Sequence, residues 1–292
     1  MQVAKGGQHG EGDLPGQTRI EARPAWTRDR CTPGAVIIAP PSPRPPALLF
    51  DVMSTLVHDP LFSVGPALFG GDLRTLFARL DREAFFAFER GELDEAGYFA
   101  RWLRPAPIAP GGQAATDSGA VRSSAAQPSA AQPNATGPSA ATAGDGPDPA
   151  TFLAAMAAGY AWLPGVEALL SDLRALGFTE VHAFSNYPPW WQTIEARLGL
   201  SRHLRWTAVS CLTGLRKPDP AAYLDAARRV GRPPSACVFV DDRPENVAAA
   251  RAVGMMGVVC VEAETLRAEL GALLAPWGGR ALCDAKTKGG GR

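Results

Sequence analysis

Apolar and polar positions along the chain alternate in blocks that predict strands and helices in turn. Short apolar runs typical of buried strands occur at 47–52, 181–184, 206–211, 237–240 and 258–261. Apolar residues recur at helical spacing in the intervening segments 72–89, 94–102, 148–160, 164–176, 220–230 and 244–253, and another helix begins near Pro189. This alternation predicts an α/β fold with a doubly wound parallel sheet.

The helical block after the first strand interrupts the regular alternation of strands and helices. We expect a core made of residues 47–57 and 163–275, and a small helical cap, residues 58–162, inserted after the first strand. Such an insertion would lie over the strand ends, where α/β proteins bind their ligands.

Three segments do not have the composition of packed structure. Residues 1–46 are rich in glycine, proline and charge and contain no apolar core of a secretory signal, which leaves a disordered tail or a candidate organelle transit peptide. Residues 105–147 consist mostly of small and polar residues, which predicts a disordered insertion within the cap. We expect residues 276–292 to form a tail.

Composition narrows the class of protein. The 292 residues are 46% hydrophobic and carry 29 basic and 29 acidic side chains, so no basic field points to nucleic acid. No apolar run approaches the roughly 20 residues that span a bilayer, so we expect no membrane association. The five cysteines are scattered, which disfavours a disulfide framework and a zinc site.

Carboxylates come directly after two of the predicted strands. Asp51 ends the first apolar run, and Asp241 and Asp242 end the fourth. The carboxyl ends of parallel strands meet at one edge of the sheet, so these three side chains should lie together. A carboxylate there can attack phosphorus as a nucleophile, and a cluster of carboxylate oxygens suits Mg²⁺.

Two further polar positions fit the same edge. Ser185 and Asn186 follow the second strand and can hydrogen-bond phosphate oxygens. Lys217 lies in a Lys-Pro-Asp-Pro turn that fixes its position, and its charge can offset a phosphate. Taken together, the set predicts phosphate chemistry, whereas each position alone is also compatible with an ordinary turn.

The segments around Asp51, Ser185, Lys217 and Asp241, in this order along the chain, resemble the four motifs of the haloacid dehalogenase-like hydrolase superfamily. More narrowly, residues 50–53, 57–60, 88–91, 182–188 and 216–220 resemble the plant and algal chloroplast FMN hydrolases. That family removes phosphate from flavin mononucleotide (FMN) with Mg²⁺, giving riboflavin. The resemblance therefore implies a phosphatase for a small phosphate ester, located in the chloroplast.

The resemblance also implies roles for individual residues. By this resemblance Asp51 is the nucleophile, and Ser185 and Lys217 are phosphate ligands. Asp242 would bind Mg²⁺, helped by Asp241 and by the backbone carbonyl of Met53. One position departs from the superfamily. Most of its phosphatases have a second aspartate, the leaving-group acid, where this chain has Met53, so water, His58 or Asp59 would have to supply the proton.

Substrate choice would lie with the cap and its neighbouring loops. Trp190 and Trp191 follow the predicted phosphate-binding turn, and either ring could stack on a flavin or serve as core. Three other functions stay open at this point: a phosphatase for another small phosphate monoester, a carbon–halogen hydrolase, for which Met53 is harmless, and a non-catalytic flavin- or phosphate-binding protein.

Overall fold

The computed structural model describes residues 44–103 and 146–284. Most of the candidate transit peptide, most of the low-complexity insertion and residues 285–292 of the expected tail lie outside the described residues. The fold below is therefore that of the core and of the cap helices on either side of the insertion.

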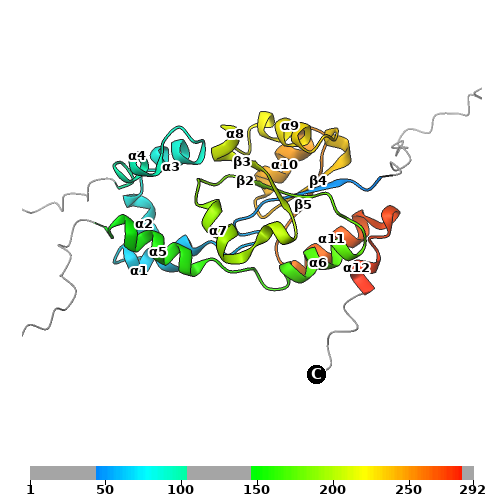
Figure 1. The fold of residues 1–292 in the computed structure, drawn as a ribbon, viewed down its shortest axis with the longest axis horizontal. Helices are drawn as coiled ribbons and strands as arrows, with labels where there is room; N and C mark the ends of the chain where they lie inside the picture. The colour runs from blue at the N-terminus through cyan, green and yellow to red at the C-terminus, as the bar shows by residue number, and fades with distance from the viewer. Residues whose placement is uncertain (1–43, 104–145, 285–292) are drawn as a thin grey trace, which may run out of the picture. The chain divides into compact units, whose positions relative to one another are not determined.

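Five parallel strands form the central sheet (Figure 1). They are β1 (Ala47–Phe50), β2 (Val181–Ser185), β3 (Arg205–Val209), β4 (Cys237–Asp241) and β5 (Met256–Val259). Their order across the sheet is β3-β2-β1-β4-β5, with every neighbouring pair parallel. The predicted doubly wound parallel sheet is confirmed, and β1 lies at its centre.

Successive residues of β1 face opposite sides of the sheet, and both sides are covered. Leu49 belongs to the apolar cluster beneath α9 (Pro220–Arg229) and α10 (Pro244–Ala252). Leu48 and Phe50 belong to the cluster on the other side. Burial on both faces explains why these strands appear in the sequence as continuous apolar runs rather than as an alternation.

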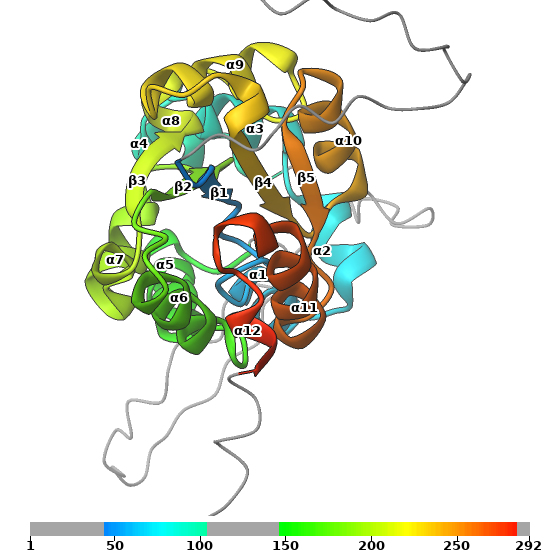
Figure 2. The same ribbon diagram turned by 90° about the vertical axis from the view of Figure 1, so that its right-hand side faces the viewer.

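Four further core helices lie on the second face (Figure 2): α6 (Val166–Ala175), α7 (Trp191–Leu198), α11 (Ala263–Leu273) and α12 (Ala281–Asp284). The short helix α8 (Ser210–Thr213) follows β3 and lies beside α9. The 3₁₀ turns are η1 (Leu200–Arg202), η2 (Pro234–Ala236) and η3 (Ala275–Trp277). Residues 276–284, expected to begin a tail, include α12, whose Leu282 is fully buried. The sequence analysis also did not anticipate α11.

Within residues 44–103 and 146–162, five cap helices follow β1. They are α1 (Pro60–Leu68), α2 (Leu73–Arg79), α3 (Arg82–Glu89), α4 (Glu95–Phe99) and α5 (Pro149–Gly159). The single helix expected over 72–89 is in fact two, because Leu80 is extended and the Asp81 carboxylate accepts hydrogen bonds from the first-turn amides of α3. An aspartate in this position is a strong helix-start signal.

The chain enters and leaves the cap through two adjacent segments. Val57 pairs antiparallel with Trp162, His58 N–H donates to the Ala161 carbonyl, and Leu163 N–H donates to the Leu56 carbonyl. The two linkers that join the cap to the core are therefore paired with each other, and the first of them directly follows the loop after Asp51. Within residues 44–103 and 146–284, none of the helices has the length and apolar character to cross a bilayer.

Candidate active site

The carboxyl ends of β1 and β4 bring three carboxylates together. Asp51 follows the last residue of β1, Asp241 is the last residue of β4, and Asp242 comes next. One oxygen from each of the three lies within 4.8 Å of the other two. The register explains this, because Phe50 is aligned with Val240 across the β1–β4 pair.

Lys217 occupies the centre of the cluster. Its Nζ donates to Asp51 Oδ1 at 2.8 Å, to Asp241 Oδ2 at 2.7 Å and to the Phe184 carbonyl at 2.9 Å. The residue is 2% exposed and is the only lysine in the part of the chain that the structure describes. The ammonium is thus fully hydrogen-bonded and holds the carboxylates of two strands against each other.

Burial and charge shift the pKa values of these groups. Burial, opposed by Lys217 and reinforced by Asp241, raises the pKa of Asp51 from 3.8 to about 7. Burial also raises the pKa of Asp242, again with a contribution from Asp241. Burial alone would lower the pKa of Lys217, but Asp51 and Asp241 outweigh it and raise that pKa above its ordinary value.

The raised pKa of Asp51 predicts that Asp51→Asn stabilises the metal-free protein at alkaline pH. A carboxyl with a raised folded-state pKa stabilises the fold fully below pH 3.8, and this contribution is lost as the pH rises through about 7. At pH 8 in EDTA we expect the variant to unfold about 5 °C above the parent, equivalent to roughly 1–2 kcal/mol. The gain should shrink at pH 5.

Thermal unfolding by circular dichroism measures this difference. Asp172→Asn is a matched control, since the Asp172 side chain on α6 is 40% exposed and forms an ion pair with Arg267 on α11. It should shift the midpoint by about 1 °C or less. An Asp51→Asn protein that melts below the parent at pH 8 would contradict the assigned burial cost.

The two adjacent carboxylates after β4 differ in their surroundings. Asp241 is fully buried and accepts from Lys217 and from the Arg243 N–H, and both of its carboxylate oxygens accept from Asn246 Nδ2. Asp242 is only partly buried, and its Oδ1 lies 3.5 Å from Thr55 Oγ1, which in turn accepts the Asp242 N–H at 3.0 Å. Asp242 therefore keeps more capacity to bind a further ligand than Asp241 does.

The donor set of the cluster fits a hard divalent cation. Three carboxylates face one ammonium, so the cluster carries an excess of negative charge when all four groups are ionised. Oxygen ligands and net negative charge are what Mg²⁺ requires. A cation bound there would offset the burial cost of the charged carboxylates and the repulsion from Asp241, which together raise the pKa of Asp51 and Asp242.

The predicted phosphate ligands of β2 have different environments. Ser185 is 1% exposed, and its Oγ has no hydrogen-bond partner among the described residues. The Asn186 amide instead brackets the main chain of Lys217: its Oδ1 accepts the Lys217 N–H and its Nδ2 donates to the Lys217 carbonyl, both at 2.9 Å. Buried hydroxyls are nearly always hydrogen-bonded, so the Ser185 Oγ is free to bind a water or a ligand, whereas the Asn186 side chain already binds the Lys217 main chain.

The two tryptophans after the β2 turn are packed within the protein. Trp190 is 6% exposed, its Nε1 donates to Glu95 Oε2 of α4 at 2.7 Å, and its ring meets Phe88 of α3 edge-on. The ring centroid of Trp191 lies 5.0 Å from that of Trp206 in β3. In this structure Trp190 joins cap to core, and stacking of either ring on a substrate stays a prediction.

Three residues of the site were not anticipated from the sequence. Asn246, in the first turns of α10, holds Asp241, and Thr55 holds the Asp242 main chain. Glu89 of the cap is 4% exposed and forms an ion pair with Arg216, the residue before Lys217. Asn246 could have been found from the sequence, because it lies only five residues after Asp241. The partners Glu89 and Arg216 are 127 positions apart, and no sequence pattern links them.

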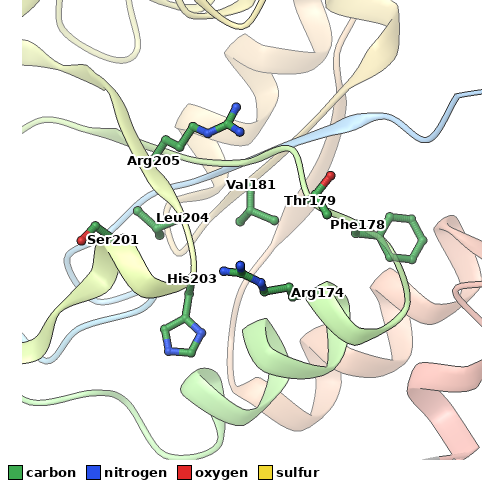
Figure 3. Close-up of a pocket in the computed structure, with 8 residues that line it drawn as sticks. All are labelled: Arg174, Phe178, Thr179, Val181, Ser201, His203, Leu204 and Arg205. Carbon is green, nitrogen blue, oxygen red and sulfur yellow. The ribbon is translucent and has the colours of Figure 1, made fainter.

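A separate hollow of about 240 Å³ lies at the opposite edge of the sheet (Figure 3). Its lining includes Val181 and Arg205, the first residues of β2 and β3, together with Arg174 and His203. Arg174 Nη1 donates to the Arg202 carbonyl. The hollow contains none of the carboxylates described above and is therefore distinct from the candidate active site.

Comparison with known proteins identifies a relative that is similar over most of the chain. The chain is 34% identical over 225 residues to the chloroplast protein flavin mononucleotide hydrolase 1 of Arabidopsis thaliana, covering 77% of this chain and 76% of the relative. A family model described as haloacid dehalogenase-like hydrolase matches residues 133–254.

Other similarities are shorter or weaker. A phosphoglycolate phosphatase of Pseudomonas syringae is 33% identical over 99 residues, covering 34% of this chain and 35% of that protein. A solved enzyme of the HAD family from Bacteroides thetaiotaomicron, in complex with magnesium and inorganic phosphate, is 14% identical with a TM-score of 0.48, over 75% of this chain and 96% of its own.

Proposed function

Because the chain belongs to the haloacid dehalogenase-like hydrolase superfamily, we propose that it is a Mg²⁺-dependent phosphatase that hydrolyses FMN to riboflavin and phosphate. The observation that carries the phosphatase chemistry is the position of Lys217, buried between Asp51 and Asp241. An ammonium there can offset the charge of both a carboxylate nucleophile and the phosphate that it attacks.

Asp51 is the proposed nucleophile. Lys217 Nζ engages its Oδ1, while its Oδ2 has no hydrogen bond from the described residues and can approach phosphorus. Attack forms an Asp51–phosphorus bond and breaks the bond between phosphorus and the ribityl oxygen. Water then attacks the same phosphorus, releases phosphate and regenerates the carboxylate, so one difficult step becomes two easier ones.

Ser185 and Lys217 are the proposed phosphate ligands. Ser185 Oγ is buried without a partner and directly follows Phe184, whose carbonyl binds Lys217 Nζ. A hydroxyl and an ammonium so placed can donate to phosphate oxygens as charge builds on them. The Asn186 side chain binds the Lys217 main chain, so its backbone N–H and the second N–H of its amide group are the donors proposed for phosphate.

Asp51, Asp242 and the Met53 carbonyl, with Asp241 behind them, are the proposed Mg²⁺ ligands. When bound, Mg²⁺ supplies positive charge that neutralises phosphate oxygens and screens the carboxylates from one another. Met53 cannot donate a proton to the leaving ribityl oxygen. We propose that this proton comes from water or from a group on the segment that leads into the cap, where Asp59 is half-buried and burial raises its pKa.

FMN as substrate is supported by the Arabidopsis relative, which covers most of the chain. The phosphoglycolate phosphatases match only about a third of it, so they support the core chemistry rather than a substrate. The same relative supports a chloroplast location. Failure of residues 1–46, fused to a fluorescent protein, to enter chloroplasts would argue against that compartment.

Phosphate release by the full chain tests the proposed function. FMN, flavin adenine dinucleotide, pyridoxal phosphate, phosphoglycolate and an aryl phosphate would be compared with Mg²⁺ and with EDTA. We expect the highest kcat/KM on FMN, and EDTA should abolish turnover of every substrate.

Two outcomes would correct the proposal in different ways. Metal-dependent turnover that favours another phosphate ester would retain the phosphatase and replace FMN as its substrate. Tight FMN binding without phosphate release from any substrate would favour a binding protein over an enzyme.

A further inference from the structure

A carboxylate of the cap contacts the loop that carries Lys217. Glu89, the last residue of α3, is 4% exposed, and its Oε2 accepts from Arg216 Nε at 2.5 Å. The Arg216 guanidinium also lies 3.9 Å from the ring centroid of Phe86 on the same helix. Helix α3 therefore holds Arg216 by an ion pair and by a cation–π contact.

The cost of burying this ion pair falls mainly on Glu89, whose side chain is 5% exposed, whereas that of Arg216 is 22% exposed. Removing two charges from water generally offsets most of their mutual attraction, so apolar residues in their place often stabilise a protein equally well. Burial raises the pKa of Glu89, and Arg216 opposes that shift. A pair of this kind at a cap–core contact thus calls for a role other than stability.

Arg216 and Asn186 hold the Lys217 main chain from two directions. The Asn186 amide bonds both the Lys217 N–H and the Lys217 carbonyl, and Arg216 Nη1 lies 3.4 Å from the same carbonyl. The Lys217 side chain then reaches Asp51 and Asp241. The position of the ammonium is consequently linked, through Arg216, to the position of a cap helix.

The end of α3 approaches the core closely. Gly91 has a φ of +72°, and a Cβ added to it would lie 2.6 Å from the carbonyl oxygen of Cys211 in α8. Only glycine allows this approach and this backbone conformation together. This close approach places the segment after Glu89 against the core. The Glu89–Arg216 ion pair therefore forms only when the cap packs on the core.

We propose that Glu89 is a positioning residue, which through Arg216 holds Lys217 in its working geometry when the cap is seated on the core. The inference rests on the proposed phosphatase function and adds a role for the cap beyond covering the substrate. Movement of the cap away from the core would break the Glu89–Arg216 contact. Arg216 would then no longer be held against the Lys217 carbonyl, and Asn186 would be left as the side chain that holds the Lys217 main chain.

Steady-state kinetics with an aryl phosphate test this role. Glu89→Gln keeps the shape of the side chain and removes its charge, and we expect kcat to fall by about 10²-fold with KM nearly unchanged, the scale of loss for a misplaced catalytic group. The matched control is Glu95→Gln, which alters the other cap–core carboxylate, bonded to Trp190 rather than to the Lys217 loop. Its kcat should stay within about twofold of the parent.

A double variant separates positioning from general destabilisation. If Glu89 acts through Arg216, Glu89→Gln combined with Arg216→Gln should lose no more activity than the worse single variant. Glu89→Asp, which keeps the charge on a shorter side chain, should retain more activity than Glu89→Gln and serves if the latter does not fold.

Several results would overturn the inference. The first is a kcat of Glu89→Gln equal to that of Glu95→Gln, and the second is an effect of Glu89→Gln on KM alone. The third is a double variant whose loss of kcat equals the product of the losses in the two single variants. A parent without phosphatase activity would instead reject the proposed function itself, and this role with it.

Discussion

Asp51→Asn is expected to abolish phosphate release from FMN. Asparagine keeps the size of the side chain but cannot form the covalent bond to phosphorus, and loss of a nucleophile lowers kcat by about 10⁵-fold or more. Phosphate release with Mg²⁺ measures the effect, and Asp172→Asn, on the far side of the core, should match the parent. Turnover by Asp51→Asn within about tenfold of the parent would exclude Asp51 as the nucleophile.

Stability distinguishes this loss from unfolding. The same variant is expected to melt above the metal-free parent at pH 8, since burial raises the pKa of Asp51 to about 7. A variant that loses activity but gains thermal stability would show that the Asp51 carboxylate is needed for catalysis and destabilises the fold.

Lys217→Met is expected to give the second largest effect. Lys217 Nζ makes three hydrogen bonds, two of them to carboxylates, and methionine replaces the ammonium by an apolar side chain of similar length. We expect kcat to fall by about 10²–10³-fold, as when a charge-stabilising group is removed from an active site. The Asp51 and Asp241 carboxylates would also be left close together without their cation.

The variant should therefore be less stable as well as less active. Removing one member of a buried ion pair costs about 3–5 kcal/mol, so metal-free Lys217→Met should melt well below the parent, and Mg²⁺ should restore part of the difference. Lys217→Arg keeps the charge but does not fit a site built around one compact ammonium, and we expect it not to restore kcat. Full activity in Lys217→Met would contradict the charge-offset role of Lys217, and full activity in Lys217→Arg would contradict the need for one compact ammonium.

The sheet and the carboxylate cluster could be predicted from the sequence for a physical reason. Parallel strands buried on both faces are continuous apolar runs, so Asp51 and Asp241 stand out where two of the runs end. Parallel pairing then places those ends at one edge without further information. Lys217 was predictable for a related reason, because its prolines fix the turn that carries it.

The side-chain partners of the site could not be predicted in the same way. Sequence identifies Asn186 as a hydrogen-bonding residue at the phosphate edge, but only the fold shows its amide turned onto the Lys217 main chain. Trp190 was a candidate for flavin stacking, whereas its position against Glu95 and Phe88 depends on how the cap meets the core. The Glu89–Arg216 pair is of the same kind.

Secondary structure shows the same limit on a smaller scale. The apolar spacing over 72–89 is continuous, yet the chain breaks at Leu80, and the local preference of Asp81 for a helix start prevails over the wider pattern. The helix α11 was not anticipated, although it packs Leu266 and Leu270 into the core.

The most direct test of the central claim is to identify the phosphorylated residue during turnover. The full chain would be mixed with Mg²⁺ and an aryl phosphate, quenched in acid within the first turnover, and digested for mass spectrometry. We expect a hydroxylamine-sensitive phosphoryl group on Asp51. A phosphoryl group on another residue, or metal-dependent turnover that persists in Asp51→Asn, would contradict it.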